Sequence, residues 1–489
     1  MSEVILPPDG TLVPVAAPAY DSKAKLSLGA ACWALFEGGR TPYVILITIY
    51  IFMPYLARTV VGDPVKGQVL VSQMQQFTGW TVALTAPLLG ASIDKLGGRK
   101  FWLALIVALM VPLIASLWFT KADGTGLSVT ETLLIAYVIG VLFTYSEVFH
   151  NSLLIRAAGF STAHKASGLA LSLGNGFSVL ALGFTCWAFA LPGLPSTANW
   201  SWLPHAPLFG LLRSLHEPER VVALMSAALF ASCAIPFFFF TPDAPKSGVP
   251  VLAAFRSGAV DLWRMIKTVG EFRDAATFLV SRMFYVDGMT AILIFGGIYA
   301  AGVMKWAPLE LLAFGIILSI LGVVGGFVGR WMDHVLGPKR SVQIAIGMAT
   351  LGMIASLGMA PDKILYVWHW DLGAHANVWN GPFFRTVPEW VYLLIGFNNA
   401  VFITAHYASS RTLLTRLTPP EKSGAFFGVY ALSGTATVWL GSLLVNIGTR
   451  VFKTQQGGMA SVILLLVIGS IGLTFVKGGG RPDEASDPS

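Results

Sequence analysis

Charged side chains stand inside long apolar segments of this 489-residue chain. Glu37 and Arg40 are three positions apart in one such segment, so they share one face of a helix. A charge in the middle of a bilayer costs at least about 2.5–3.5 kcal/mol on insertion scales, and it therefore usually faces a cavity or a partner. These residues could bind an ion or a polar solute, or they could neutralise each other.

Comparable groups recur in three further apolar segments. Glu147 and His150 are again three positions apart, and His406 lies alone in a later segment. Arg282 and Asp287 are five positions apart, which turns them about 140° from each other on a helix and disfavours a pair. Asp287 is the strongest single candidate for a functional carboxylate.

Two interpretations of these charges remain open. In one, a carboxylate (Glu37 or Asp287) binds a proton or a cation. An arginine, Arg40 or Arg282, would then hold an anionic group of a solute, because a guanidinium can bond both oxygens of a carboxylate. In the other, Glu37 and Arg40 are a neutral structural pair and Glu147 belongs to a gate. Further candidates for contact with a solute or a proton are Tyr43, Asn398, Asn399 and His406.

The elements that carry these residues must lie in a membrane. The chain is 55% hydrophobic and 12% charged, against a typical charged share of about 25% in soluble proteins. A spanning helix needs about 20 apolar residues. Twelve segments meet this need: 27–56, 69–93, 101–120, 132–154, 166–190, 220–240, 275–303, 309–332, 341–360, 388–412, 423–447 and 457–476.

The positive charges are unevenly divided between the two sides of these spans. About 20 of the Lys and Arg residues fall on one side and about 10 on the other, and the basic side is expected to be cytoplasmic. An even number of spans places both termini there. The basic residues form no dense run, so a nucleic-acid partner is not expected.

A glycine-bearing polar turn occurs twice, about half the chain apart. Residues 90–100 read GASIDKLGGRK, and residues 329–340 read GRWMDHVLGPKR. Each turn links two apolar segments, which is typical of a duplicated membrane transporter. The acidic residues Asp94 and Asp333 can accept hydrogen bonds from a helix start or pair with a cation.

The duplication predicts a two-bundle organisation. We expect a cytoplasmic tail over 1–26, a six-helix bundle over 27–240, a second bundle over 275–476 and a tail over 477–489. Between the bundles, residues 241–274 mix apolar and basic residues at helical spacing. This segment either lies on the inner membrane surface or caps the ends of the bundles.

No enzyme or cofactor site is expected. The three cysteines fall inside predicted spans, no Cys and His cluster has metal-ligand spacing, and a phosphate-binding GxxxxGK loop is missing from the sequence. No cleavable signal peptide is expected, so the first span would direct insertion.

The two turns resemble the signature loop of the major facilitator superfamily. This resemblance implies a cytoplasmic gate that stabilises the outward-facing state, and helices one, four, seven and ten around a central cavity. We expect the gate to comprise Asp94, Gly98, Arg99, Lys100, Glu147, Asp333, Lys339 and Arg340.

Three stretches resemble a narrower group, the vacuolar effluxer-like branch of autophagy-related major facilitators. They are WALFEGGRTPY over 33–43, FYVDGMT over 284–290 with GGIYAAG over 296–302, and SR at 410–411 through FFGVYALSG over 426–434, which includes PPEK at 419–422. The resemblance implies twelve helices and, for the eukaryotic branch, amino-acid efflux from a vacuole. Glu37, Arg40 and Tyr407 depart from the residues usual in that branch.

We therefore expect an all-α secondary transporter with two pseudo-symmetric six-helix bundles, active as a monomer in a bacterial inner membrane or a vacuole-type membrane. A small polar solute such as an amino acid is the first expected substrate, and protons are the candidate coupling ion. A sugar or glycoside symporter is an alternative, because Tyr43, Tyr299 and Tyr407 could stack on a ring. A non-transporting scaffold or sensor of the same fold is a second alternative.

Overall fold

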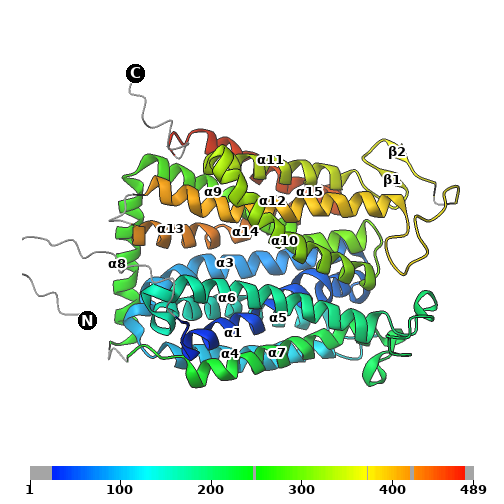
Figure 1. The fold of residues 1–489 in the computed structure, drawn as a ribbon, viewed down its shortest axis with the longest axis horizontal. Helices are drawn as coiled ribbons and strands as arrows, with labels where there is room; N and C mark the ends of the chain where they lie inside the picture. Colours follow the sequence, from blue (N-terminus) through cyan, green and yellow to red (C-terminus); the bar gives the residue numbers. More distant parts are fainter. Residues whose placement is uncertain (1–24, 246–248, 372, 419–422, 479–489) are drawn as a thin grey trace, which may run out of the picture.

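Long helices run side by side along the length of the molecule in the computed structural model (Figure 1). The structure describes residues 25–245, 249–371, 373–418 and 423–478. Helices are the expected outcome for these apolar runs, because in lipid each backbone N–H and C=O group needs a partner within its own segment. The PPEK stretch at 419–422 and most of the two tails lie outside the described residues.

The first half of the chain forms six spanning segments. They are α1 (Leu28–Tyr43) with η1 (Val44–Tyr50), α2 (Phe52–Tyr55) and η2 (Leu56–Val60); α3 (Pro64–Leu96); α4 (Arg99–Ser116) with η3 (Leu117–Phe119); α5 (Val129–Ser152); α6 (Leu154–Thr185) with η4 (Cys186–Ala190); and α7 (Glu217–Phe240). The loop before α7 contains three short 3₁₀ turns: η5 (Pro195–Thr197), η6 (Leu208–Gly210) and η7 (Arg213–Leu215).

The second half of the chain forms six more spanning segments. They are α9 (Arg273–Gly302), α10 (Pro308–Leu336), α11 (Pro338–Leu357), α12 (Val387–Leu417), the interrupted pair α13 (Ser423–Thr435) and α14 (Val438–Phe452), and α15 (Gln455–Thr474). A small antiparallel hairpin of β1 (Lys363–Ile364) and β2 (Trp368–His369) lies in the loop before α12.

Twelve spanning segments were predicted, and the fold confirms them. Eleven helical segments of the described chain are long and apolar enough to cross a membrane. The twelfth is α3, whose 33 residues lie among the other helices (Figure 1). Buried polar side chains such as Gln68 and Gln76 lower its hydropathy, and burial between neighbouring helices keeps them away from lipid.

Helix α8 (Val251–Gly270) crosses one end of the molecule, at a steep angle to the spans (Figure 1). Ala254 and Gly258 are buried on its inner side, and Gly258 packs closely on Ser92 of α3. Leu252 and Trp263 are 83% and 69% exposed on its outer side. The segment therefore covers the ends of the helices, which is one of the two arrangements that the sequence predicts for it. We call this end of the molecule the α8 end and the opposite one the loop end.

The two repeated turns lie at the α8 end and have the same construction. Gly98 and Gly337 have φ values of 53° and 81°, a left-handed region that side chains disfavour. In the first turn the Lys100 ammonium donates to the Thr241 carbonyl, just after α7 (2.7 Å). In the second the Lys339 ammonium donates to the Val476 carbonyl, just after α15 (2.5 Å). Each turn is thus fastened to the last helix of its own half.

Candidate functional site

A cavity of about 280 Å³ lies between the two halves. Its wall comes from η1 and α6 of the first half and from α9, α10, α11, α12 and α15 of the second. Aliphatic side chains make up much of the wall. Its polar members are Tyr50, Asn175, Ser178, Tyr299, Ser319, Ser356, Tyr392, Asn399, Thr404 and Tyr407. This volume is near the lower end of the range of small-molecule sites.

The cavity wall is uncharged. Among the described residues that line it there is no Asp, Glu, Lys, Arg or His, and the titratable side chains are tyrosines. Hydroxyl and amide groups can donate and accept hydrogen bonds, and the tyrosine rings offer flat apolar faces. The site can therefore bind a solute with a few hydrogen-bonding groups and an apolar part.

The structure places one of the eight expected contact residues, Asn399, in this wall. Its neighbour Asn398 instead donates to the Met348 carbonyl of α11 (2.8 Å). Tyr43 packs on Phe143, with ring centroids 5.7 Å apart. His406 is fully buried, and its ring Nδ1 contacts the Ile403 carbonyl of its own helix.

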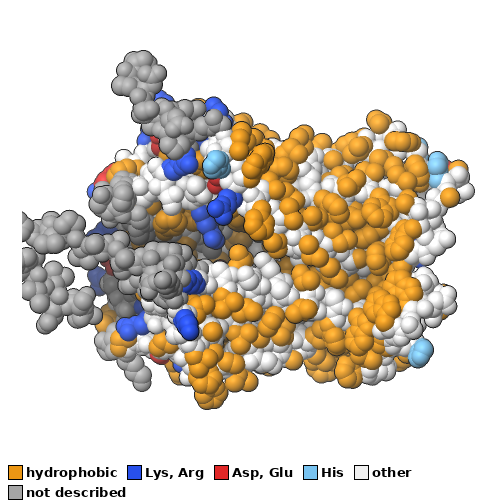
Figure 2. All heavy atoms as spheres, in the orientation of Figure 1, with side chains coloured by type: hydrophobic (Ala, Val, Ile, Leu, Met, Phe, Trp, Pro, Cys, Tyr) orange, Lys and Arg blue, Asp and Glu red, His pale blue; other side chains and the backbone are white. Residues whose placement is uncertain are grey.

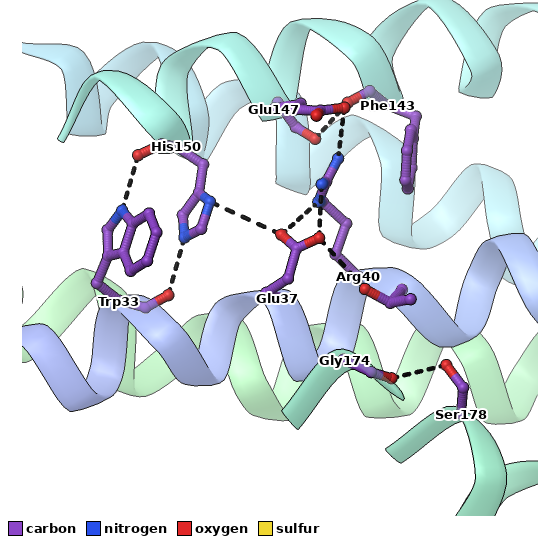
Figure 3. A network of polar contacts seen from close by, with 10 residues as sticks. Trp33, Glu37, Arg40, Phe143, Glu147, His150, Gly174 and Ser178 are labelled. Atoms are coloured by element: carbon purple, nitrogen blue, oxygen red, sulfur yellow. Dashed lines mark hydrogen bonds and ion pairs between the residues drawn. The ribbon is translucent and has the colours of Figure 1, made fainter. Parts of the chain in front are cut away.

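Glu37 and Arg40 form a bidentate pair on α1, outside the cavity wall (Figure 3). Arg40 Nη2 lies 2.7 Å from Glu37 Oε1, and Arg40 Nε lies 3.0 Å from Oε2. The same guanidinium reaches Glu147 Oε2 of α5 at 3.4 Å and lies over the Phe143 ring. Arg40 is 5% exposed, so this three-residue cluster joins two helices inside the first bundle.

His150 completes this cluster. Its ring stacks on Trp33, with centroids 4.3 Å apart, and its Nε2 lies 2.8 Å from the Trp33 carbonyl. Its Nδ1 is 3.8 Å from Glu37 Oε2 and has no hydrogen-bond partner among the described residues. A protonated His150 would face a carboxylate, whereas a neutral one leaves two carboxylates sharing a single arginine.

Arg282 and Asp287 face α13 and α14 instead of each other. Arg282 Nη1 donates to the Tyr430 carbonyl (2.8 Å) and to Ser433 Oγ (2.6 Å). Asp287 Oδ2 accepts from the backbone N–H of Gly441 (2.7 Å). Both charged side chains are buried, and neither belongs to the cavity wall.

Several of the expected gate residues make contacts within their own halves. Arg99 donates to the Ser152 carbonyl (2.6 Å), and the backbone N–H of Lys100 donates to Asp243 (3.0 Å). Asp333 accepts the N–H of Gly337 through its backbone carbonyl. Arg340 has an interaction of its own, and the side chain of Asp94 lies outside the described residues.

Buried and partly buried polar contacts join the two halves at the loop end. Gln68 of α3 donates to Thr449 Oγ1 of α14 (2.8 Å) and to the Gln455 carbonyl (3.1 Å). Asn446 of α14 donates to the Val69 carbonyl (2.9 Å), and Arg58 donates to the Trp306 carbonyl (2.6 Å). We call these contacts the loop-end closure.

Sequence reasoning missed the closure and most of the cavity wall. Gln68, Thr449 and Gln455 lie one or two residues outside the predicted spans, where the sequence predicts loops. Pairs of amides near span ends are the feature that could have indicated them. The serines and Tyr50 of the wall differ little from polar residues elsewhere in the spans.

Comparison with known proteins places the chain among transporters. It is 20% identical over 468 residues to an uncharacterized MFS-type transporter of Bacillus subtilis, covering 93% of this chain and 95% of that protein. It is 27% identical over 210 residues to autophagy-related protein 22 of Yarrowia lipolytica, covering 42% of this chain. The chain spans about a third of the length of that fungal protein, since 32% of it is covered.

Solved transporters share the fold. A nucleoside transporter covers 92% of this chain with a TM-score of 0.61 at 12% identity, and a D-xylose-proton symporter covers 93% with a TM-score of 0.58 at 13% identity. A family model described as "Vacuole effluxer Atg22 like" matches residues 213–479, which is more than half of the 489 residues. The protein belongs to this Atg22-like effluxer family of major facilitator transporters.

Proposed function

We propose that this major facilitator protein is a secondary transporter that moves a small, polar but uncharged solute by alternating access. The solute binds in the cavity between the two halves, against Asn399 and Tyr407 of α12 and Tyr299 of α9. The observation that carries this proposal is the uncharged wall of that cavity. Burying an ionised group without a partner costs several kcal/mol, so this wall favours neutral solutes.

Alternating access is supported by an asymmetry between the two ends. At the loop end the halves are joined by Gln68, Asn446 and Arg58, as described above. Towards the α8 end the space-filling view is hollowed between the halves, next to Lys and Arg side chains (Figure 2). We assign the α8 end, where the described part of the chain begins and ends, to the cytoplasm on the basis of its positive charge. The structure then corresponds to an inward-facing state.

We assign proton coupling to the cluster of Glu37, Arg40, Glu147 and His150. Two carboxylates share one guanidinium there, so the cluster carries a net charge of −1 when His150 is neutral. Binding one proton neutralises it, which lowers the cost of holding it in a membrane. The Glu147 side chain is 47% exposed, against 22% for Glu37, so it is the more accessible of the two carboxylates.

An amino acid with an apolar side chain is the second candidate solute. The family match favours it, and so does the first span, which loses regular helical geometry at Ile51 (φ −121°, ψ −66°). This break is next to Ile49 and Tyr50 of the cavity wall. Backbone groups at an interrupted helix can bind the charged ends of a zwitterion.

Ligand-induced stabilisation of the purified protein separates these candidates. A solute that binds the folded state raises its melting temperature by mass action. We expect nucleosides, glycosides or other neutral solutes to stabilise the protein, and Asn399→Ala to remove the effect. Stabilisation by apolar amino acids instead would favour the second candidate. A solute whose effect is unchanged in Asn399→Ala would not be bound in this cavity.

A further inference from the structure

Helix α9 contacts the interrupted helix α13/α14 on both sides of its break. The two pieces belong to one span, but they are separated at Ala436 and Thr437. Thr437 has φ −114° and ψ 4°, and its hydroxyl donates to the Met283 carbonyl of α9 (2.8 Å). The break is thus in direct contact with the segment of α9 between Arg282 and Asp287.

Asp287 lies beside the N-terminus of α14, the helix that follows the break. The first turn of a helix presents backbone N–H groups to partners outside the helix, and Gly441 is the fourth residue of α14. The Asp287 carboxylate accepts this N–H at 2.7 Å and is 4% exposed. A negative charge is favourable at a helix N-terminus. A Cβ on Gly441 would come within 3.2 Å of Oδ1, so glycine permits this approach.

Arg282 lies beside the C-terminus of α13, the helix that precedes the break. Its guanidinium donates to the Tyr430 carbonyl and Ser433 Oγ, and its Cζ lies 3.7 Å from the centre of the Tyr430 ring. A positive charge is favourable near a helix C-terminus. Gly434 leaves the space that the guanidinium fills, because a Cβ there would approach Nη1 to 3.3 Å.

The helix held in this way carries part of the loop-end closure. Asn446, Thr449 and Arg450 of α14 contact α3 at Val69, Gln68 and Gln73. We infer that Arg282 and Asp287 are positioning residues that hold the two pieces of α13/α14 in register, so that α14 can close the loop end against α3. The inference needs alternating access, but it does not depend on which solute is carried.

The decisive comparison is Asp287→Asn against Asp287→Ala. Asn is as good as Asp at accepting N–H groups at a helix start, whereas Ala cannot accept them. Spin labels at Lys66→Cys on α3 and Phe452→Cys on α14, with Cys32, Cys186 and Cys233 replaced by Ser, report the closure without any solute. Both labelled positions are exposed.

We expect Asp287→Asn to keep the closed distance and to keep transport within about twofold. Asp287→Ala should lower the population of molecules with a closed loop end by about fivefold or more. Asp123→Asn, which changes an exposed carboxylate in the loop before α5, is the matched control and should change neither readout.

Two results would overturn the inference. One is a loss of transport in Asp287→Asn as large as in Asp287→Ala, because the ionised carboxylate itself would then be required. The other is an unchanged closed distance in Asp287→Ala. If Asp287→Ala does not fold, Arg282→Gln and Arg282→Lys replace it. Both variants must then lower the closed population, and Arg282→Lys must lower it less than Arg282→Gln. A closed population equal to that of the parent in both variants would reject the positioning role.

Discussion

Asp287 of α9 accepts the backbone N–H of Gly441 at the start of α14, with the two atoms 2.7 Å apart. This contact gives the most isolated carboxylate of the sequence a partner that is neither a cation nor a solute. It also connects the middle of the second bundle to the helix that closes the loop end. A buried charge in a transporter can therefore position the helices of the loop-end closure without contacting the solute.

The closure depends on buried amides, so removing one should open it. Gln68→Ala leaves Thr449 and Gln455 without their donor, and an unsatisfied buried polar group costs about 1–3 kcal/mol. We expect the loop end to open in a larger share of molecules. The measurement is the distance between spin labels at Lys66→Cys and Phe452→Cys in the otherwise cysteine-free protein. A distribution of distances equal to that of the parent would contradict this role of Gln68.

Glycines at the closure should tolerate no side chain. A Cβ on Gly458 would come within 2.6 Å of Gln68 Nε2 and 2.9 Å of the Val445 carbonyl. Gly458→Ala should therefore weaken the closure and lower the melting temperature. Gly326→Ala is the matched control, since nothing lies within 4 Å of its Cβ and alanine favours helix by about 1 kcal/mol. Equal melting temperatures for the two variants would contradict the packing described for Gly458.

Arg40 should contribute strongly to the free energy of unfolding. Arg40→Leu leaves Glu37 and Glu147 without their shared partner, and breaking a buried ion pair costs about 3–5 kcal/mol. Because Glu147 is partly exposed, we expect the lower part of this range. Thermal unfolding in detergent measures the loss. The double variant Arg40→Leu with Glu37→Leu should recover part of it, and no recovery would reject the pairing as the cause.

Proton coupling should depend on the number of carboxylates in the same cluster. Glu147→Gln removes the excess negative charge and leaves the Glu37–Arg40 pair in place. We expect solute exchange between equal pools to continue, while accumulation driven by a pH gradient falls at least about tenfold. Glu131→Gln, at the exposed start of the same helix, is the control. Accumulation that remains intact in Glu147→Gln would remove the cluster from the coupling mechanism.

The fold was predictable because lipid leaves few choices to an apolar chain. The twelve spans and the duplication follow from hydropathy and from the turns at Gly98 and Gly337. The cavity and the closure were not predictable in the same way. Hydropathy placed Gln68 and Thr449 just outside the spans, although in the structure they are buried between helices.

The role of Asp287 required knowledge of a break that hydropathy does not show. The segment from 423 to 447 is continuous by composition, and no proline marks Ala436 and Thr437. Without the break there is no helix start for the carboxylate to bind. The charge of Asp287 was evident from the sequence, but its partner, a backbone N–H, becomes available only in the folded chain.

The proposed function requires an uncharged solute to cross the membrane through the cavity that Asn399 and Tyr407 line. Flux of radiolabelled nucleosides, glycosides and apolar amino acids into vesicles containing the purified protein tests it most directly, with Asn399→Ala and Tyr407→Phe measured beside the parent. We expect saturable flux of a neutral solute that falls at least about tenfold in Asn399→Ala, while the protein stays folded. Flux restricted to charged or zwitterionic solutes, or flux unchanged in both variants, would contradict it.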